Sequence, residues 1–165
     1  MSEELLREWA ATEVFYVPTV DHNRYYADHG SEYGYDSATE AALRSFVDRN
    51  TETLRRAIRH GVRIAMGSDA VMTMFGENTR ELEWFVEAGM TPGDAIRAAT
   101  LNGALLLGQA QTLGRIAEGF RADLIGVVGD PTEYIRAVSR GVRWVMKDGA
   151  VVVDRRQQEI GGCAD

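Results

Sequence analysis

The segment GVRIAMGSDA, residues 61–70, runs from a short apolar stretch into a glycine, a serine and a carboxylate. The continuous apolar stretch within 62–66 is typical of a parallel strand that is covered on both faces. Ligands of α/β folds bind at the carboxyl ends of parallel strands, and Asp69 follows such an end. A carboxylate there can bind a metal ion or act as a general base on metal-bound water. The alternative is that Asp69 only caps a turn, as Asp often does after Gly-Ser.

The neighbouring segments alternate between strand and helix patterns. Residues 13–20, EVFYVPTV, are rich in β-branched and aromatic residues and predict a strand that ends near Pro18. A helix is expected over 3–11, and another from an N-cap at Ser37 to a stop at Gly61. The long segment between them, 21–36, has no period and predicts a loop, which at this length is often functional. This order predicts an α/β fold with parallel strands.

The second half of the chain starts with two helix patterns and ends in strands. A helix is predicted over 77–89, and Thr91 is expected to cap the next one. Residues 142–153 form two apolar runs around Lys147-Asp148-Gly149, which predicts a β-hairpin. The sequence after Gly114 therefore indicates a small β appendage.

Other polar residues have simpler explanations beside functional ones. His22 and Tyr25 lie in the predicted loop and could contact a substrate, although a single histidine without a paired ligand is more often a surface or packing residue. The same holds for His29 and the other tyrosines of this segment. The glutamates of the predicted helix are expected on a solvated face: Glu77, Glu81, Glu83 and Glu87.

Composition excludes several classes of partner. The 165 residues carry a net charge of −7 with a pI near 5.0, which argues against nucleic acid and anionic membrane surfaces. No apolar run approaches the ~20 residues that span a bilayer. The acidic amino terminus is unlike a signal peptide, and Cys163 is the single cysteine. A cytoplasmic protein without an internal disulfide is the simplest interpretation.

Five segments together resemble the carboxyl end of the amidohydrolase superfamily, in its imidazolonepropionase-like and Xaa-dipeptidase-like (prolidase-type) branch. They are VPTV (17–20), GVRIAMGSDA (61–70), ELEWFVEAGMTPGDAIRAAT (81–100), LGRIAEGFRADLIGVVGDP (113–131) and VRWVMKDGAVV (142–152). The resemblance implies the last two βα units of a (β/α)₈ TIM-type barrel over 1–112, and the carboxyl-terminal strands of a small β-sandwich over 113–165. It also implies that Asp69 binds a divalent metal, with zinc expected, and takes a proton from the attacking water.

The chain departs from the superfamily pattern because barrel strands one to six are absent. The metal ligands that those strands carry in the superfamily are therefore absent too. No H-x-H, H-E-x-x-H or C-x-x-C occurs, whereas catalytic zinc generally has three protein ligands. We therefore expect the carboxyl-terminal segment of an enzyme that hydrolyses C–N bonds of small-molecule or dipeptide-like substrates, with Met1 an internal methionine or an artificial start. Either an amino-terminal segment is missing or the chain forms a homo-oligomer. The alternative is a non-catalytic, oligomerising remnant of the family.

Overall fold

The structure is a computed structural model that describes residues 1–70 and 74–157. Cys163 therefore lies outside the described residues. The elements, in chain order, are α1 (Glu3–Ala10), α2 (Val20–Asp28), the 3₁₀ helix η1 (Gly30–Tyr33), α3 (Ser37–Arg59), the 3₁₀ helix η3 (Asn78–Arg80), α4 (Glu81–Glu87), α5 (Pro92–Ala99), α6 (Leu101–Leu106), β1 (Leu124–Val127), α7 (Arg136–Arg140), β2 (Val142–Lys147) and β3 (Ala150–Asp154). No helix within these ranges is long and apolar enough to cross a bilayer.

The two predicted parallel strands meet at a single β-bridge between Tyr16 and Ile64. The Tyr16 amide donates to the Arg63 carbonyl at 2.8 Å, and the Ala65 amide donates to the Tyr16 carbonyl at 3.1 Å. The predicted parallel direction is confirmed, but the pairing is far shorter than expected. Pro18 follows two residues after the bridge and has no N–H to extend it.

The predicted loop over 21–36 is wrong, because most of it is helical: α2 and η1 occupy it. Arg24 stabilises α2 by ion pairs to Asp21 at 3.0 Å and to Asp28 at 2.9 Å, three and four residues away. The side chains of Val20 and Tyr25, both in this helix, are buried. Burial and these local ion pairs outweigh the weak helical pattern of the sequence.

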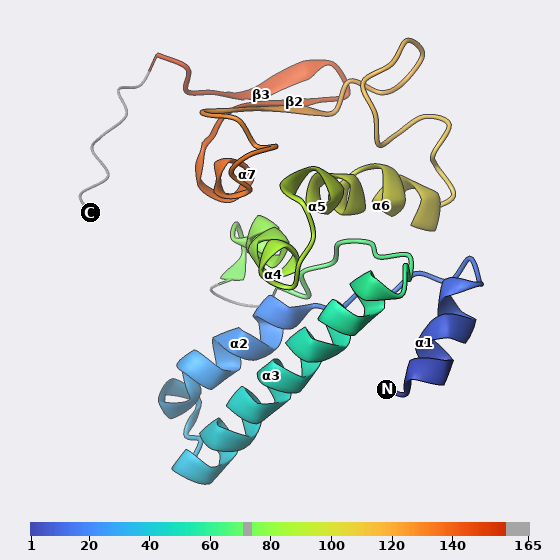
Figure 1. Ribbon diagram of the computed structural model, residues 1–165. Coiled ribbons are helices and arrows are strands. Elements are labelled where there is room, and N and C mark those ends of the chain that lie inside the picture. Colours follow the sequence, from blue (N-terminus) through green and yellow to red (C-terminus); the bar gives the residue numbers. More distant parts are fainter. Residues whose placement is uncertain (71–73, 158–165) are drawn as a thin grey trace.

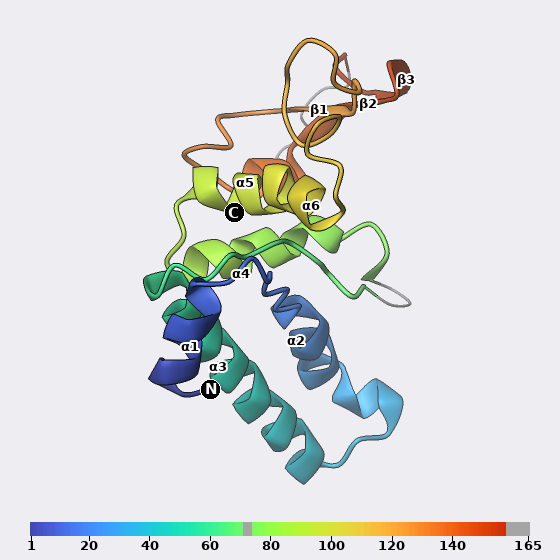
Figure 2. The same ribbon diagram turned by 90° about the vertical axis from the view of Figure 1, so that its right-hand side faces the viewer.

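The N-cap of helix α3 lies one residue earlier than predicted. Asp36, rather than Ser37, is the N-cap, and its side chain accepts the Thr39 amide at 2.8 Å. Gly61 ends the helix with a φ of 73°, as predicted. Helices α2 and α3 lie side by side as a hairpin that extends away from the rest of the molecule (Figures 1 and 2).

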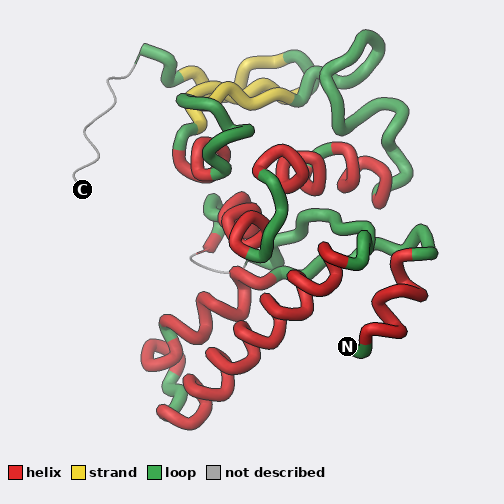
Figure 3. The backbone as a smooth tube through the Cα atoms, viewed as in Figure 1, coloured by secondary structure: helices red, strands yellow, loops and turns green. Residues whose placement is uncertain are grey.

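The core lies where the base of this hairpin meets α1, α4 and α5. Its largest fully buried apolar side chains are Phe85, Leu6, Leu54 and Leu82. The Met66 amide donates to the Ala98 carbonyl at 3.1 Å, which fixes the second parallel segment against α5. Figure 3 shows that the chain around this junction is loop and helix, while the strands gather at the opposite end from the hairpin.

The sheet is three-stranded and antiparallel, in the order β1-β2-β3. The predicted hairpin is confirmed, because β2 pairs with β3 and Lys147 lies opposite Ala150. The turn residues Asp148 and Gly149 both have positive φ, 49° and 79°. Two positive φ values suit a two-residue hairpin turn, whose twist matches that of the strands.

Candidate functional site

Two strained residues mark the edge where the parallel segments end. Thr19 follows the first segment with a φ of 47°, and Asp69 follows the second with a φ of 48°. A left-handed conformation costs a residue with a side chain roughly 1–2 kcal/mol. Such strain concentrates at functional sites, so this edge is the first place to look for one.

Gly67 allows the two segments to approach each other closely at this edge. A Cβ atom at this position would lie 2.6 Å from Cγ1 of Val17, closer than van der Waals contact permits. Glycine is therefore required by the contact between the segments. The close approach places the turn with Asp69 beside the start of α2.

His22 and Asp69, both predicted site residues, are in contact. Nδ1 of His22 lies 2.7 Å from the backbone carbonyl of Asp69 and 3.5 Å from its carboxylate oxygen Oδ2. Because a carbonyl only accepts, Nδ1 donates, which leaves Nε2 of the neutral ring as an acceptor. The imidazole thus holds the backbone of Asp69, and among the described residues its Nε2 has no hydrogen-bond partner.

The Asp69 carboxylate is open, with 62% of the side chain exposed. Ser68 precedes it, and its hydroxyl accepts from the Ala70 amide at 3.3 Å and from Nδ2 of Asn78 at 3.0 Å. The turn-capping alternative for Asp69 involves residues 71–73, which lie outside the described part of the chain. The structure therefore shows a fixed backbone that presents an accessible carboxylate.

Tyr25, the third predicted site residue, lies inside an aromatic cluster. It is 7% exposed, and its ring stacks on His29 with centroids 4.3 Å apart. Its hydroxyl is 3.3 Å from that of Tyr33. Tyr26 joins this cluster to His22, with ring centroids 5.2 Å apart. The ring of Tyr26 thus contacts both His22 and Tyr25. The role of Tyr25 in substrate binding stays a prediction.

Glu81 is a buried carboxylate that the sequence analysis assigned to a solvated face. It is fully buried and accepts the amides of Val20 and Asp21, both at 2.8 Å. Burial raises the pKa of the Glu81 carboxyl to about 8, although the two backbone hydrogen bonds lower it. Burial also raises the pKa of the Tyr16 hydroxyl to about 12, with a contribution from the charge of Glu81.

A signal for this burial is present in the sequence. Glu81 precedes Phe85 by four residues and Ala88 by seven, and both are buried. This spacing defines one face of a helix, so Glu81 belongs to the apolar face of α4. Glu87, in contrast, is exposed as predicted.

The described residues supply only part of a metal site. Asp69 offers a carboxylate and His22 an imidazole nitrogen, Nε2, for which the described residues provide no hydrogen-bond partner; both groups suit zinc. Within residues 1–70 and 74–157 no three side chains of His, Cys, Asp or Glu are grouped closely enough to hold an ion. The residues present therefore fit one or two ligands of such a site and do not complete it.

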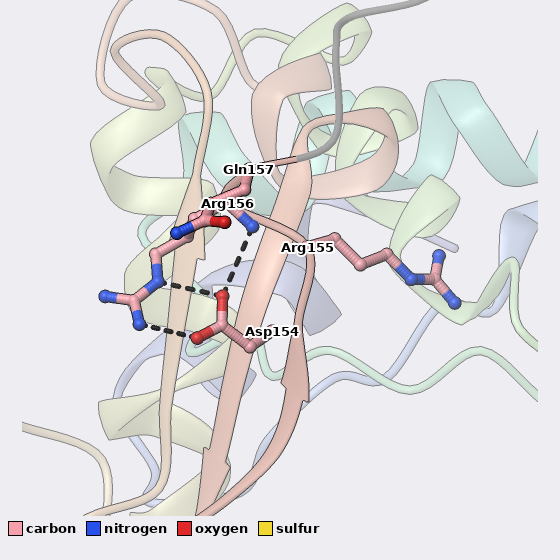
Figure 4. Close-up of a pocket in the computed structure, with 4 residues that line it drawn as sticks. All are labelled: Asp154, Arg155, Arg156 and Gln157. Carbon is pink, nitrogen blue, oxygen red and sulfur yellow. Dashed lines mark hydrogen bonds and ion pairs between the residues drawn. The ribbon is translucent and has the colours of Figure 1, made fainter.

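Away from Asp69, a depression at the end of β3 is lined by Asp154, Arg155, Arg156 and Gln157 (Figure 4). Arg156 donates two hydrogen bonds to the Asp154 carboxylate, from Nε to Oδ1 at 2.9 Å and from Nη2 to Oδ2 at 2.5 Å. Figure 4 shows Arg155 pointing away from this pair. The basic groups are thus neutralised or turned aside, and the depression is a poor candidate.

Comparison with known proteins identifies relatives over most of the chain. Ochratoxinase of Aspergillus niger is 38% identical over 113 residues, which are 66% of this chain and 23% of the relative. A crystal structure of a Xaa-Pro dipeptidase with methionine bound in its active site covers 93% of this chain and 38% of its own, with a TM-score of 0.82 and 33% identity. A prolidase complexed with N-methylphosphonate-L-proline has a TM-score of 0.83 and 28% identity over the same shares of the two chains.

The chain spans about a quarter of the curated relative and less than two fifths of these solved structures. The likeness nevertheless extends over helices, the parallel bridge and the small sheet. Residues 5–152 match the amidohydrolase family. Because this match covers nearly all of the 165 residues, the chain belongs to the amidohydrolase family.

Proposed function

We propose that this chain is the carboxyl-terminal segment of a metal-dependent amidohydrolase that hydrolyses C–N bonds. In this proposal, residues 1–112 are the last two βα units of a (β/α)₈ barrel and residues 113–165 belong to a small β-sandwich. The family membership and the parallel bridge between Tyr16 and Ile64 support it. The small share of the solved relatives that the chain covers fits a partial barrel.

Asp69 is the residue that carries the proposal. It lies at the carboxyl edge of the second parallel segment, its backbone is held by His22, and its carboxylate is open. A bound divalent metal, with zinc as the expected ion, would polarise the scissile carbonyl and lower the pKa of water. The carboxylate of Asp69 would contribute one ligand and accept the proton of the attacking water.

The substrate class that we propose is a small molecule with an amide or a dipeptide-like bond. The names of the related Xaa-Pro dipeptidase and ochratoxinase support this class. Nε2 of His22 would accept a hydrogen bond from the substrate, beside the aromatic cluster that contains Tyr25 and Tyr26. The rings would then pack against an apolar part of the substrate.

The variant Asp69→Asn tests this function. In the complete enzyme that contains this segment, release of free proline from a series of Xaa-Pro dipeptides is measured with added zinc for the wild type, Asp69→Asn and the matched control Asp48→Asn. Asp48 is exposed on α3. We expect Asp69→Asn to lower the rate by about 10²–10⁴, the usual contribution of a general base, with no change in the control. Hydrolysis that Asp69→Asn retains in full would contradict the assignment.

A non-catalytic, oligomerising segment is the second candidate. Large apolar side chains are exposed in several segments between the helices and strands, including Val14 at 57%, Leu107 at 68% and Ile116 at 88%. An exposed apolar surface of this kind supports association with another chain. Zinc content after dialysis and molar mass by light scattering separate the two candidates: a zinc-free, inactive oligomer supports the second.

A further inference from the structure

The first turn of α2 is capped by a carboxylate from a distant helix. Thr19, the residue before the helix, is left-handed and makes no side-chain cap. Oε1 of Glu81 accepts the Val20 amide and Oε2 accepts the Asp21 amide, both at 2.8 Å. The first amides of a helix have no partner within it, so Glu81 satisfies two that are buried. Figures 1 and 2 show α4 lying across this end of α2.

The same region around α4 also fixes the side chain of Asp21. Nε1 of Trp84 donates to its Oδ1 at 3.0 Å, and the guanidinium of Arg80 lies 3.8 Å from the same atom. Asp21 is 2% exposed, so these contacts are shielded from water. Both the backbone and the side chain of Asp21 are thus bound to the segment 80–84.

His22 is the next residue along the chain. Its Nδ1 lies 2.7 Å from the Asp69 carbonyl oxygen. A rotation of the first turn of α2 would break this contact. The segment 80–84 that holds Asp21 comes soon after Asp69 in the chain. Glu81 therefore joins the first turn of α2, which carries His22, to the start of α4.

We infer that Glu81 is a positioning residue: by capping the first turn of α2, it sets the imidazole of His22 against Asp69. The importance of this contact for catalysis rests on the proposed function of Asp69. Glu81 itself is fully buried and would act only through His22.

The test compares Glu81→Gln and Glu81→Asp with Glu87→Gln, an exposed position on the same helix. Gln keeps the length of the side chain but replaces one carboxyl oxygen by an NH₂ group, which cannot accept an amide, and Asp keeps both oxygens but is one methylene shorter. The ¹⁵N and ¹H shifts of the His22 ring are recorded by NMR, together with the unfolding midpoint. Amide exchange of Val20 and Asp21 is measured in the wild-type chain.

We expect Val20 and Asp21 in the wild type to exchange at least 10²-fold more slowly than unprotected amides. In either Glu81 variant that folds, the Nδ1–H signature of His22 should be lost or averaged, while Glu87→Gln leaves it unchanged. A lower unfolding midpoint with unchanged His22 signals would show a merely structural role and overturn the inference. Unprotected amides in the wild type would overturn it without any variant. Zinc binding of the wild type and Asp69→Asn, measured in parallel, tests the proposed function separately.

Discussion

The start of α2 and the turn that carries Asp69 lie side by side but are built in opposite ways. At the start of α2, Glu81 and Asp21 have buried carboxyl groups, and each accepts two hydrogen bonds. In the neighbouring turn, Asp69 is 62% exposed, and the contact to His22 fixes its backbone. One region uses carboxylates to hold the fold together, and the other leaves its carboxylate available.

This difference shows how a strained, open turn can persist. The positive φ of Asp69 costs free energy, and an exposed carboxylate contributes little to stability. The rigid neighbour compensates, because its buried hydrogen bonds hold the helix from which His22 reaches the turn. Substitutions in the two regions should therefore have very different effects on stability.

The largest expected effect is a dependence of stability on pH that arises from Glu81. The folded pKa of about 8 lies above the ordinary value of 4.5, so the folded chain holds a proton that the unfolded chain releases. This contribution to stability is fully present below pH 4.5 and is lost as the pH rises to about 8. The free energy of unfolding should fall by up to about 1.4 kcal/mol for each pH unit in this window.

Urea unfolding at pH 5, 6, 7 and 8 measures this slope in the wild type and in Glu81→Gln. The titratable groups that face Glu81 are the Asp21 carboxylate and the Tyr16 hydroxyl, and neither is altered in the variant. The variant should be less stable at pH 5 and should show a flatter profile. Parallel profiles for the two proteins would mean that Glu81 is ionised in the folded state throughout.

A smaller effect is expected where the two regions meet, at Gly67. In Gly67→Ala the new methyl group would overlap Cγ1 of Val17, so the parallel segments must separate. Overpacking of this kind costs about 1–3 kcal/mol. Thermal and urea unfolding measure the loss, with Gly93→Ala in α5 as a control, because a Cβ there would make only an ordinary contact, 3.9 Å from Oγ1 of Thr91. The double variant with Val17→Ala should recover most of the loss, and no recovery would place the strain elsewhere.

The local parts of this fold could be predicted from the sequence. The Thr91 cap is confirmed by the hydrogen bond from the Asp94 amide at 3.1 Å, and the hairpin turn at Asp148-Gly149 is confirmed by its two positive φ values. Both features depend on neighbouring residues alone, so short patterns describe them well. The family resemblance also depended on contiguous segments and is confirmed.

Features that depend on distant residues could not be predicted in this way. Local sequence predicts a loop in place of α2 because the group that caps this helix, Glu81, lies 60 residues further along the chain than Asp21. The charge of Glu81 predicts an exposed side chain, whereas its spacing of four residues to Phe85 places it on the buried face of α4. The contact between His22 and Asp69 likewise joins residues 47 positions apart, so composition could name both residues but could not show that they touch.

The smallest expected effect on stability is at Asp69 itself. Asn tolerates a left-handed backbone about as well as Asp, and the contact to His22 uses the backbone carbonyl, which Asp69→Asn retains. The free energy of unfolding should change by no more than about 0.5 kcal/mol, as for other exposed substitutions. Urea unfolding at pH 7 measures it, with Asp48→Asn as the control. A loss of 2 kcal/mol or more would show that the carboxylate supports the fold, and the contrast between the two regions would then be wrong.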